Sequence, residues 1–419
     1  MIRFSKVKVQ NPFIPLRLSL VRKEKALTTF HMYTTVRTLS LTGPQSRRAL
    51  VTSTKSHITL GMIPGDGIGH EVIPAAQRVL EAVSQSSSSP VQLTFLPLDS
   101  GFDTFTRTGD SLPIATVQAL RTQCQGALFG AVSSPIHKVE GYSSPIVRLR
   151  KELDLYANVR PIQQPHAWTA RGTQEPCDML IIRENTECLY VKQERIETDP
   201  ATGLRTAYAT RRISEYATRR IARIAFQMAR SRAAARLADH WWHPRPPTVT
   251  VVHKSNVLSV TDGLFREVVR AVRDDKEDGF ADIAVDDQLV DSMVYRLFRD
   301  PGSYDVCVLP NLYGDIVSDA AAALAGSLGV VPSANVGDSF VMGEPVHGSA
   351  PDIAGKGIAN PVAAIRSAAL LLEYLGHSDL AARIYAAVDA TTAAGISTRD
   401  IGGTSSTAQV TSAVVSRLV

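Results

Sequence analysis

Cysteine is scarce in this chain, and long hydrophobic runs are missing. The four cysteines among the 419 residues show no Cys-x-x-Cys spacing, so the sequence indicates neither a zinc site nor a disulfide framework. Free thiols in a reducing compartment are therefore the expectation. No apolar run approaches the roughly 20 residues that a membrane-spanning helix requires. We expect a soluble protein that has no membrane partner.

Acidic residues are nearly absent from the first 57 residues, which hold eleven Lys and Arg against the single acid Glu24. The remaining 362 residues hold 34 Lys and Arg against 39 Asp and Glu, so the formal charge of +5 combines a basic leader with an acidic body. A nucleic-acid-binding protein carries its basic excess on the folded part. We therefore expect no nucleic-acid partner.

The basic leader, residues 1–57, has the composition of a mitochondrial transit peptide. It is rich in Arg, Lys, Ser and Thr, and it lacks the uninterrupted apolar segment of a secretory signal. A disordered basic tail is the alternative interpretation. We expect the leader to direct the chain to the mitochondrial matrix.

Downstream of the leader, short apolar runs alternate with helical patterns. Residues 58–63 predict a buried strand, residues 64–69 a glycine turn and residues 71–83 a helix. Further strands are predicted at residues 126–131, 179–182, 249–252 and 306–310, and further helices at residues 212–230 and 320–328. This alternation predicts an α/β fold. The glycines of the turn lack the GxGxxG spacing, so they are only a weak dinucleotide signal.

Carboxylates stand out in two later segments. Asp315 and Asp319 lie four residues apart at a predicted helix start, which places both on one helical face. Asp291 lies in a largely apolar segment, where an unpaired carboxylate is costly. Carboxylate oxygens suit Mg²⁺ or Mn²⁺. The alternatives are a helix cap and first-turn acid for the pair, and a satisfied core or capping position for Asp291.

Cations and proton-transfer groups lie upstream of these segments. Arg160 and Arg183 close apolar runs, and Arg150 precedes them; a guanidinium fork in such a place suits a small polycarboxylate. Surface ion pairs are the alternative. Lys254, at the end of a predicted strand, and Tyr190 are candidate proton-transfer groups, because burial and charge can tune either one. A structural role is the alternative for both.

A glycine-rich loop runs from Gly343 to Asn360. Such a backbone can approach a cofactor closely, and Asp352 within it can accept a hydrogen bond from a ribose hydroxyl while repelling a 2′-phosphate. A plain connecting loop is the alternative, although about 18 residues without regular structure inside a compact domain indicate function.

Taken in order, these segments resemble the β-decarboxylating dehydrogenases, the family of isocitrate, 3-isopropylmalate and homoisocitrate dehydrogenases. The resemblance runs from about Ile58 to the C-terminus through the motifs IPGDGIG, LRKELDLYANVRP, RENTE-x-LY, HKSNVL, VDSMVYRLF, NLYGDIVSD and HGSAPDIAGKGIANP. Within the family, the stretch FGAVSSPIHKVEGYSSPIVRLRK is similar to the fungal homoisocitrate dehydrogenases, which are mitochondrial enzymes of the α-aminoadipate route to lysine.

The resemblance implies two α/β domains with the active-site cleft between them. Residues 58–155 and 327–419 would form the large cofactor-binding domain. Residues 156–326 would form the central domain, which binds substrate and metal and clasps a second subunit. An obligate homodimer is implied, because in this family Lys254 and Asp291 reach into the site of the partner subunit.

The resemblance also implies a role for each candidate residue. Tyr190 would protonate the enol, and Lys254 would take the hydroxyl proton. The substrate would contact Ser134, Ser143, Ser144, Arg150, Arg160, Arg183, Tyr190 and Lys254. The metal ligands would be Asp291, Asp315 and Asp319. The NAD site would be lined by Val132, Ser133, Ser134, Asn256, Gly348, Ser349, Ala350, Pro351, Asp352, Ile353 and Asn360.

The implied activity is the NAD-dependent, Mg²⁺- or Mn²⁺-assisted oxidative decarboxylation of homoisocitrate, a tricarboxylate, to 2-oxoadipate and CO₂. The alternatives are 3-isopropylmalate or isocitrate dehydrogenase and, from another class, a catalytically silent regulatory subunit. Two positions depart from the family pattern. Cys188 stands where an acid is expected, and Val147 stands where some bacterial homoisocitrate enzymes carry an arginine for the distal carboxylate. Ser134, Ser143 and Ser144 are therefore the candidates for recognition of that end of the substrate.

Overall fold

The computed structural model describes residues 57–85, 91–133, 135, 137, 139–163, 177–238 and 246–418. Residues 1–56 of the basic leader lie outside these ranges, and so does Ser134. The targeting expectation and the role of Ser134 therefore stay predictions.

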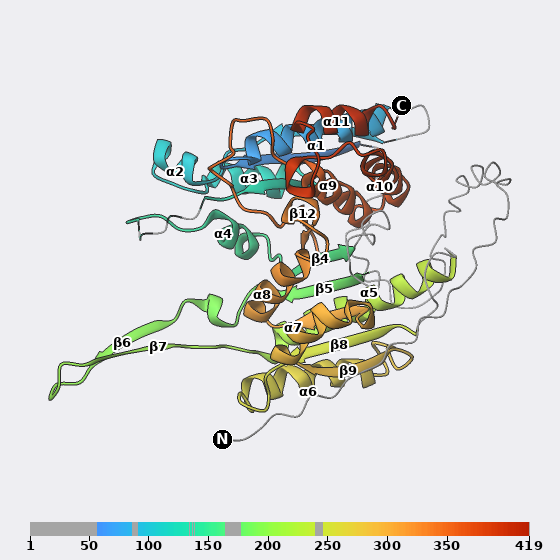
Figure 1. The fold of residues 1–419 in the computed structure, drawn as a ribbon. Coiled ribbons are helices and arrows are strands. Elements are labelled where there is room, and N and C mark those ends of the chain that lie inside the picture. The colour runs from blue at the N-terminus through green and yellow to red at the C-terminus, as the bar shows by residue number, and fades with distance from the viewer. Residues whose placement is uncertain are drawn as a thin grey trace, which may run out of the picture. The chain divides into compact units, whose positions relative to one another are not determined.

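A ten-stranded sheet forms the centre of the described fold (Figure 1). Its strand order is β2-β1-β3-β12-β11-β4-β5-β10-β8-β9, and a separate two-stranded sheet pairs β6 with β7. The strands are β1 (His57–Gly65), β2 (Gln92–Pro97), β3 (Gly126–Ala131), β4 (Ala157–Gln163), β5 (Asp178–Glu184), β6 (Glu194–Thr198), β7 (Arg205–Ala209), β8 (Thr248–His253), β9 (Ala284–Leu289), β10 (Val306–Leu309), β11 (Ala334–Val336) and β12 (Val341–Gly343).

Most neighbouring strands of the large sheet are parallel. The antiparallel pairs are β4 with β5, β4 with β11, and β11 with β12. Every residue of β3, β5 and β10 is buried, as expected of strands that are covered on both faces. The predicted α/β class is confirmed, and each of the predicted strands is present.

Strands from the two ends of the described chain make up one half of the sheet. β2, β1, β3, β12 and β11 come from residues 57–131 and 334–343, whereas β4, β5, β10, β8 and β9 come from residues 157–309. This order is compatible with the two domains implied by the resemblance. Their boundaries stay a prediction.

Helices follow most of the strands. The helices are α1 (Gly69–Gln85), α2 (Phe102–Thr108), α3 (Ile114–Gln123), α4 (Pro145–Glu152), α5 (Glu215–Ala238), α6 (Thr261–Asp274), α7 (Val290–Arg299), α8 (Asn311–Ala322), α9 (Val362–Tyr374), α10 (Ser378–Ala393) and α11 (Thr407–Val415). Phe265, Val268, Val269 and Val272 recur on one side of α6 and are buried, which is the spacing of an amphipathic helix that covers a sheet.

The predicted helix at residues 320–328 was wrong in its bounds. α8 begins at Asn311, directly after Pro310, whose φ of −58° suits the position before a first helical turn. The chain then leaves the helix after Ala322 and reaches Gly326, which has a φ of +96°. The apolar run continues past the helix end because Leu324 and Ala325 are buried in the turn that follows.

The glycine turn after β1 brings three backbone segments into contact. Gly65 has a φ of +72°, and a Cβ added there would lie 1.9 Å from the carbonyl oxygen of Ala131. Gly67 has a φ of +56°, and its added Cβ would lie 2.1 Å from the carbonyl oxygen of Ser349. Only glycine permits both the positive φ and the close approach. The turn therefore packs directly on the end of β3 and on the glycine-rich loop.

Asp66, between these glycines, is fully buried. Its carboxylate accepts hydrogen bonds from the backbone N–H groups of Phe102 at 2.9 Å, Asp103 at 2.9 Å and Ser133 at 2.8 Å. A buried carboxylate with several backbone donors is well compensated. Asp66 thereby joins the segment after β3 to the start of α2.

The hairpin of β6 and β7 projects from the large sheet (Figure 1). All residues of both strands are exposed, and an isolated two-stranded hairpin is only marginally stable in water. None of the described helices is both long enough and apolar enough to cross a membrane.

Candidate active site

The candidate site lies where β5 and β10 end side by side. Leu309, the last residue of β10, is in register with Arg183 of β5, and the antiparallel strand β4 places Arg160 opposite Ile181. α8 follows β10 immediately, so Asp315 and Asp319 face the arginines of both neighbouring strands. This edge is where parallel α/β sheets commonly hold their ligands.

Asp315 is the centre of the cluster. One of its carboxylate oxygens accepts a hydrogen bond from the Arg183 guanidinium, and the other accepts one from the Tyr190 hydroxyl. Arg160 lies 3.8 Å from the first oxygen. The Arg183 guanidinium also lies 5.2 Å from the centre of the Tyr190 ring, which is within cation–π range.

Asp319 lies one helical turn further on and is more exposed. Arg160 Nη1 donates to its Oδ1 at 3.1 Å, and Arg160 Nε donates to Asn158 at 2.6 Å. The Asp319 side chain is 58% exposed, against 8% for Arg160, so the cluster opens on the Asp319 side. α8 has Pro310 at its N-cap and no acid in its first turn. The structure therefore does not support the helix-capping alternative for these aspartates.

Arg150 joins the cluster through a network of buried polar groups. Its Nη2 donates to Glu344 at 3.3 Å, and Glu344 also accepts a hydrogen bond from Asn335. Asn335 in turn accepts from Asn158 at 3.0 Å and from Asn185 at 2.9 Å. Among the described residues, Arg150 Nε is buried and has no hydrogen-bond partner.

Burial and charge shift the pKa values of the cluster. Burial lowers the pKa of Arg183 to about 10, and the nearby Arg150 adds to this effect. Burial alone would raise the pKa of Asp315, but Arg183 and the hydrogen bond from Tyr190 bring it below its ordinary value. Burial raises the pKa of Asp319. Burial and the bond to Asp315 raise the pKa of Tyr190, so this phenol stays protonated at neutral pH.

Lys254 and Asp291 form a separate pair. Lys254, directly after β8, donates from Nζ to Asp291 Oδ1 at 2.6 Å, and this bond lowers the pKa of Asp291. The Asp291 side chain is 62% exposed. No described hydrogen bond or ion pair links Lys254 or Asp291 to Asp315 or Asp319. Within the described part of one chain, no three His, Cys, Asp or Glu side chains gather as a metal site.

Most of the predicted cofactor residues lie in two segments that touch. Ser133 Oγ donates to Ser349 Oγ at 3.0 Å, and the carbonyl of Ser349 accepts from Ile68 N–H at 2.9 Å. Val132 precedes Ser133, and Ser349 belongs to the segment Gly348, Ser349, Ala350, Pro351, Asp352 and Ile353. The predicted loop is confirmed, because residues 344–361 contain no helix or strand.

The other predicted contact residues occupy loops and helix starts. Asn360 accepts from Val362 N–H at 3.0 Å at the start of α9. Asn256 is exposed in the loop after Lys254. Ser143 accepts through its carbonyl from Ser111 Oγ at 2.6 Å, and Ser144 precedes α4. The chemical roles of all these residues stay predictions.

The residues present fit both groups that the resemblance implies. Asp315 and Asp319 offer hard oxygen donors one helical turn apart, which suits a divalent cation, although a third carboxylate is needed from elsewhere. A Cβ added at Gly348, Gly355 or Gly357 would meet nothing within 4 Å. The backbone of this loop is thus open to a ligand, and the exposed carboxylate of Asp352 lies beside it.

Three residues that support the site were not predicted from the sequence. Asp66 anchors the segment of Ser133, Glu344 pairs with Arg150, and Asn335 connects the strands of the two halves of the sheet. Only Asp66 had a sequence pattern that could have pointed to it, because its two flanking glycines indicate a crowded backbone. Glu344 and Asn335 become recognisable only when β11 and β12 are placed beside β4.

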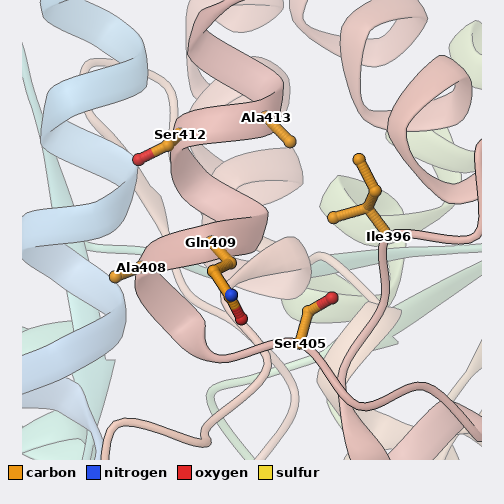
Figure 2. Close-up of a pocket in the computed structure, with 6 residues that line it drawn as sticks. All are labelled: Ile396, Ser405, Ala408, Gln409, Ser412 and Ala413. Atoms are coloured by element: carbon orange, nitrogen blue, oxygen red, sulfur yellow. The ribbon is translucent and has the colours of Figure 1, made fainter.

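The groove shown in Figure 2 lies away from these residues. It has a volume of about 490 Å³ and is lined by Ile396, Ser405, Ala408, Gln409, Ser412 and Ala413. None of these side chains is ionisable, so the groove offers no group for acid–base or metal chemistry.

Comparison with known proteins gives the family. The family model described as isocitrate/isopropylmalate dehydrogenase matches residues 59–414. An isocitrate/homoisocitrate dehydrogenase of Thermus thermophilus is 46% identical over 357 residues, which are 85% of this chain and 97% of that protein. A 3-isopropylmalate/3-methylmalate dehydrogenase of Methanocaldococcus jannaschii is 40% identical over 357 residues, 85% of this chain and 98% of that protein.

Solved structures agree with this result. The crystal structure of isocitrate dehydrogenase from Methylococcus capsulatus matches with a TM-score of 0.76 and 37% identity, over 86% of this chain and 99% of that chain. The chain belongs to the isocitrate/isopropylmalate dehydrogenase family. It is a dehydrogenase of a family whose members generally use NAD(P) and a divalent metal, and are typically homodimers that act on small molecules.

Substitution of Gly314 tests the geometry of the cluster around Asp315. A Cβ at this helical position would lie 2.5 Å from Cγ and 2.6 Å from Cβ of Arg183, so Gly314→Ala must displace the arginine from Asp315. We expect dehydrogenase kcat/KM to fall by about tenfold or more, because misplacement by about 1 Å costs up to ~100-fold.

Gly263→Ala is the matched control, since Gly263 also lies in the first turn of a helix and its added Cβ meets nothing within 4 Å. We expect this variant to keep its kcat/KM and to gain up to ~1 kcal/mol of stability in thermal unfolding. Equal kcat/KM for the two variants would contradict the packing of Arg183 against α8.

Proposed function

We propose that this protein is an NAD-dependent, Mg²⁺-assisted homoisocitrate dehydrogenase of lysine biosynthesis, which converts homoisocitrate to 2-oxoadipate and CO₂. The cluster of Arg150, Arg160 and Arg183 around the two aspartates of α8 carries the proposal. Three buried or nearly buried guanidinium groups in one place suit a substrate with several carboxylates. The name of the Thermus thermophilus relative includes both isocitrate and homoisocitrate, which is compatible with this substrate.

The three arginines bind and orient the substrate in the proposed mechanism. Their present partners are protein carboxylates, so the guanidinium groups are already directed into the site. When bound, a divalent ion held by Asp315, Asp319 and Asp291 of the partner subunit supplies Lewis-acid polarisation of the substrate oxygens. Ser133 and the glycine-rich loop would hold NAD, which would supply the hydride acceptor.

Proton transfer is assigned to Lys254 and Tyr190. Lys254 of the partner subunit takes the hydroxyl proton as the carbon-bound hydride leaves, which yields a β-keto acid. The bond to the β-carboxylate then breaks, CO₂ leaves, and the bonding electron pair remains as an enolate, whose oxygen takes a proton back from Lys254 to give the enol. Tyr190 donates its proton to the enol carbon while the enol oxygen returns its proton to Lys254, which gives the keto product. The raised pKa of Tyr190 and its hydrogen bond to Asp315 keep the phenol protonated until that step.

NAD is favoured over NADP because Asp352 and Ile353 stand in the loop that would face the ribose. A carboxylate there accepts from the ribose hydroxyls and repels a 2′-phosphate. The silent-subunit alternative requires the loss of a metal ligand, the lysine or the tyrosine. Asp291, Asp315, Asp319, Lys254 and Tyr190 are all present, which disfavours it.

A homodimer with shared sites is part of the proposal. Large apolar side chains are exposed beside Lys254 and on α7, which carries Asp291; they are Val257, Val260, Tyr295 and Phe298. Clustered exposed apolar residues favour burial against another chain. The fully exposed hairpin of β6 and β7 likewise gains stability from a partner.

3-Isopropylmalate dehydrogenase is the second candidate. Ile146 and Val147 of α4 are half-buried and offer apolar surface for an isopropyl group, and the Methanocaldococcus jannaschii relative carries that name. The neighbouring Ser143 and Ser144 are polar, which favours a carboxylate at the distal end of the substrate.

Turnover on homoisocitrate, isocitrate and 3-isopropylmalate tests the proposal, with NAD⁺ or NADP⁺ and with Mg²⁺ or EDTA. We expect the highest kcat/KM with homoisocitrate, NAD⁺ and Mg²⁺, and loss of activity in EDTA. A kcat/KM tenfold higher on 3-isopropylmalate would select the second candidate. No turnover on any of the three substrates would revive the silent subunit.

We also propose that residues 1–57 direct the chain to the mitochondrial matrix, on the basis of their charge and composition. A fluorescent protein fused to this segment should colocalise with a matrix marker. Replacing the eleven Lys and Arg of the segment by Gln is the matched control and should abolish import. A wild-type fusion that stays in the cytosol would contradict the targeting proposal.

A further inference from the structure

A fully buried aspartate binds the backbone of Lys254. Asp262, in the first turn of α6, has a side chain with no exposed surface. Its Oδ2 accepts the backbone N–H of Lys254 at 2.7 Å, and its Oδ1 lies 2.7 Å from Arg211 Nη2. A buried carboxylate is costly unless its oxygens are paired. Here one of the partners is the residue assigned to proton transfer.

The hydrogen bond from Lys254 N–H to the Asp262 side chain also helps to close the loop that carries Lys254. The carbonyl of Lys254 accepts from Leu258 N–H at 2.8 Å, and the carbonyl of Leu258 accepts from Asp262 N–H at 3.0 Å. The Asp262 side chain then returns to Lys254 N–H. The loop from β8 to α6 is thus fastened at both ends, and Asp262 sets where the lysine backbone lies.

Arg211 connects this loop to the acid cluster. Its side chain is 11% exposed, and its guanidinium carbon lies 4.4 Å from the centre of the Tyr313 ring, two residues before Asp315 in α8. The next residue, Arg212, accepts through its carbonyl from Cys188 N–H at 2.8 Å, two residues before Tyr190. Arg211 therefore lies between the elements that carry Lys254, Asp315 and Tyr190.

We infer that Asp262 is a positioning residue for Lys254, with Arg211 as the partner of its buried charge. Asp262 holds the lysine backbone, and Arg211 ties Asp262 to α8 and to the turn of Tyr190. Neither side chain touches the reacting atoms. The inference rests on the proposed function, because it requires Lys254 to take part in turnover.

A second buried aspartate, at the other end of β8, provides a matched control. Asp305 Oδ2 accepts the backbone N–H of Thr248, the first residue of β8, at 3.3 Å, and its carboxylate pairs with Arg236. Asp262 binds the residue after the other end of β8. Both aspartates are buried and each holds one end of β8; Asp262 pairs with Arg211, and Asp305 pairs with Arg236 and Arg232. Only the Asp262 end carries a proposed catalytic group.

The test compares variants of the full-length homodimer. Arg211→Met with Asp262→Asn removes both buried charges but keeps an oxygen that can accept Lys254 N–H. Arg211→Met with Asp262→Ala removes the acceptor as well. We expect kcat to be at least tenfold lower in the alanine variant than in the asparagine variant, with the KM for NAD within about twofold, as expected of a positioning defect.

The same two changes at the control pair, in Arg236→Met with Asp305→Asn or Asp305→Ala, should change Tm but leave kcat within about twofold. All rates are measured at a temperature at which circular dichroism shows each variant folded. If the Asp262→Ala variant does not fold, Asp262→Leu, which fills the space and lacks an acceptor, replaces it.

A Lys254→Ala background separates positioning from a general structural effect. If Asp262 acts through Lys254, the asparagine and alanine variants should have the same kcat once the lysine is removed. The same tenfold difference in that background would overturn the inference, and so would equal kcat with Lys254 present. Full turnover by Lys254→Ala alone would overturn the proposed role of Lys254 as well, which is a different result.

Discussion

The ionic contacts between Asp315 and the buried guanidinium groups are the interaction on which the site depends. Arg183 is 3% exposed and Arg160 8% exposed, and charges so far from water are costly unless carboxylates lie against them. Asp315 supplies that compensation from α8, and Tyr190 adds a hydrogen bond to its second oxygen. Gly314 supports the same ion pair, because the absence of a Cβ at this position lets the Arg183 side chain pack closely against α8.

This arrangement means that the proposed active site is preorganised. The arginines are held by protein carboxylates before a substrate arrives, so their guanidinium groups are already oriented when a polycarboxylate binds. The half-exposed Asp319 marks the open side of the cluster. The third carboxylate, Asp291, and the proton-transfer group Lys254 lie together elsewhere on the chain, beside exposed apolar residues. One chain therefore holds two incomplete parts of the proposed site.

Local patterns in the sequence predicted five strands, β1, β3, β5, β8 and β10, of which β3, β5 and β10 are buried on both faces and have unbroken apolar runs. The other described strands were not predicted. The four-residue spacing correctly placed Asp315 and Asp319 on one face of a helix. The partners of these residues could not be predicted from the sequence. Arg160 and Asp319 are 159 positions apart, and only the strand order of the sheet brings them together. The asparagine network around Asn335 depends on the same order. The bounds of α8 were wrong because buried apolar residues continue past its end.

The central claim is that two chains complete each active site, and mixing two homodimers that each retain only residual activity tests it most directly. Asp315→Asn damages the acid cluster of its own chain, and Lys254→Ala damages the group offered to the other chain. After subunit exchange, a hybrid dimer holds one site with both residues intact. We predict that dehydrogenase activity returns to about one quarter of the wild-type value, the statistical limit for a two-fold dimer. A mixture no more active than its two components would contradict the claim.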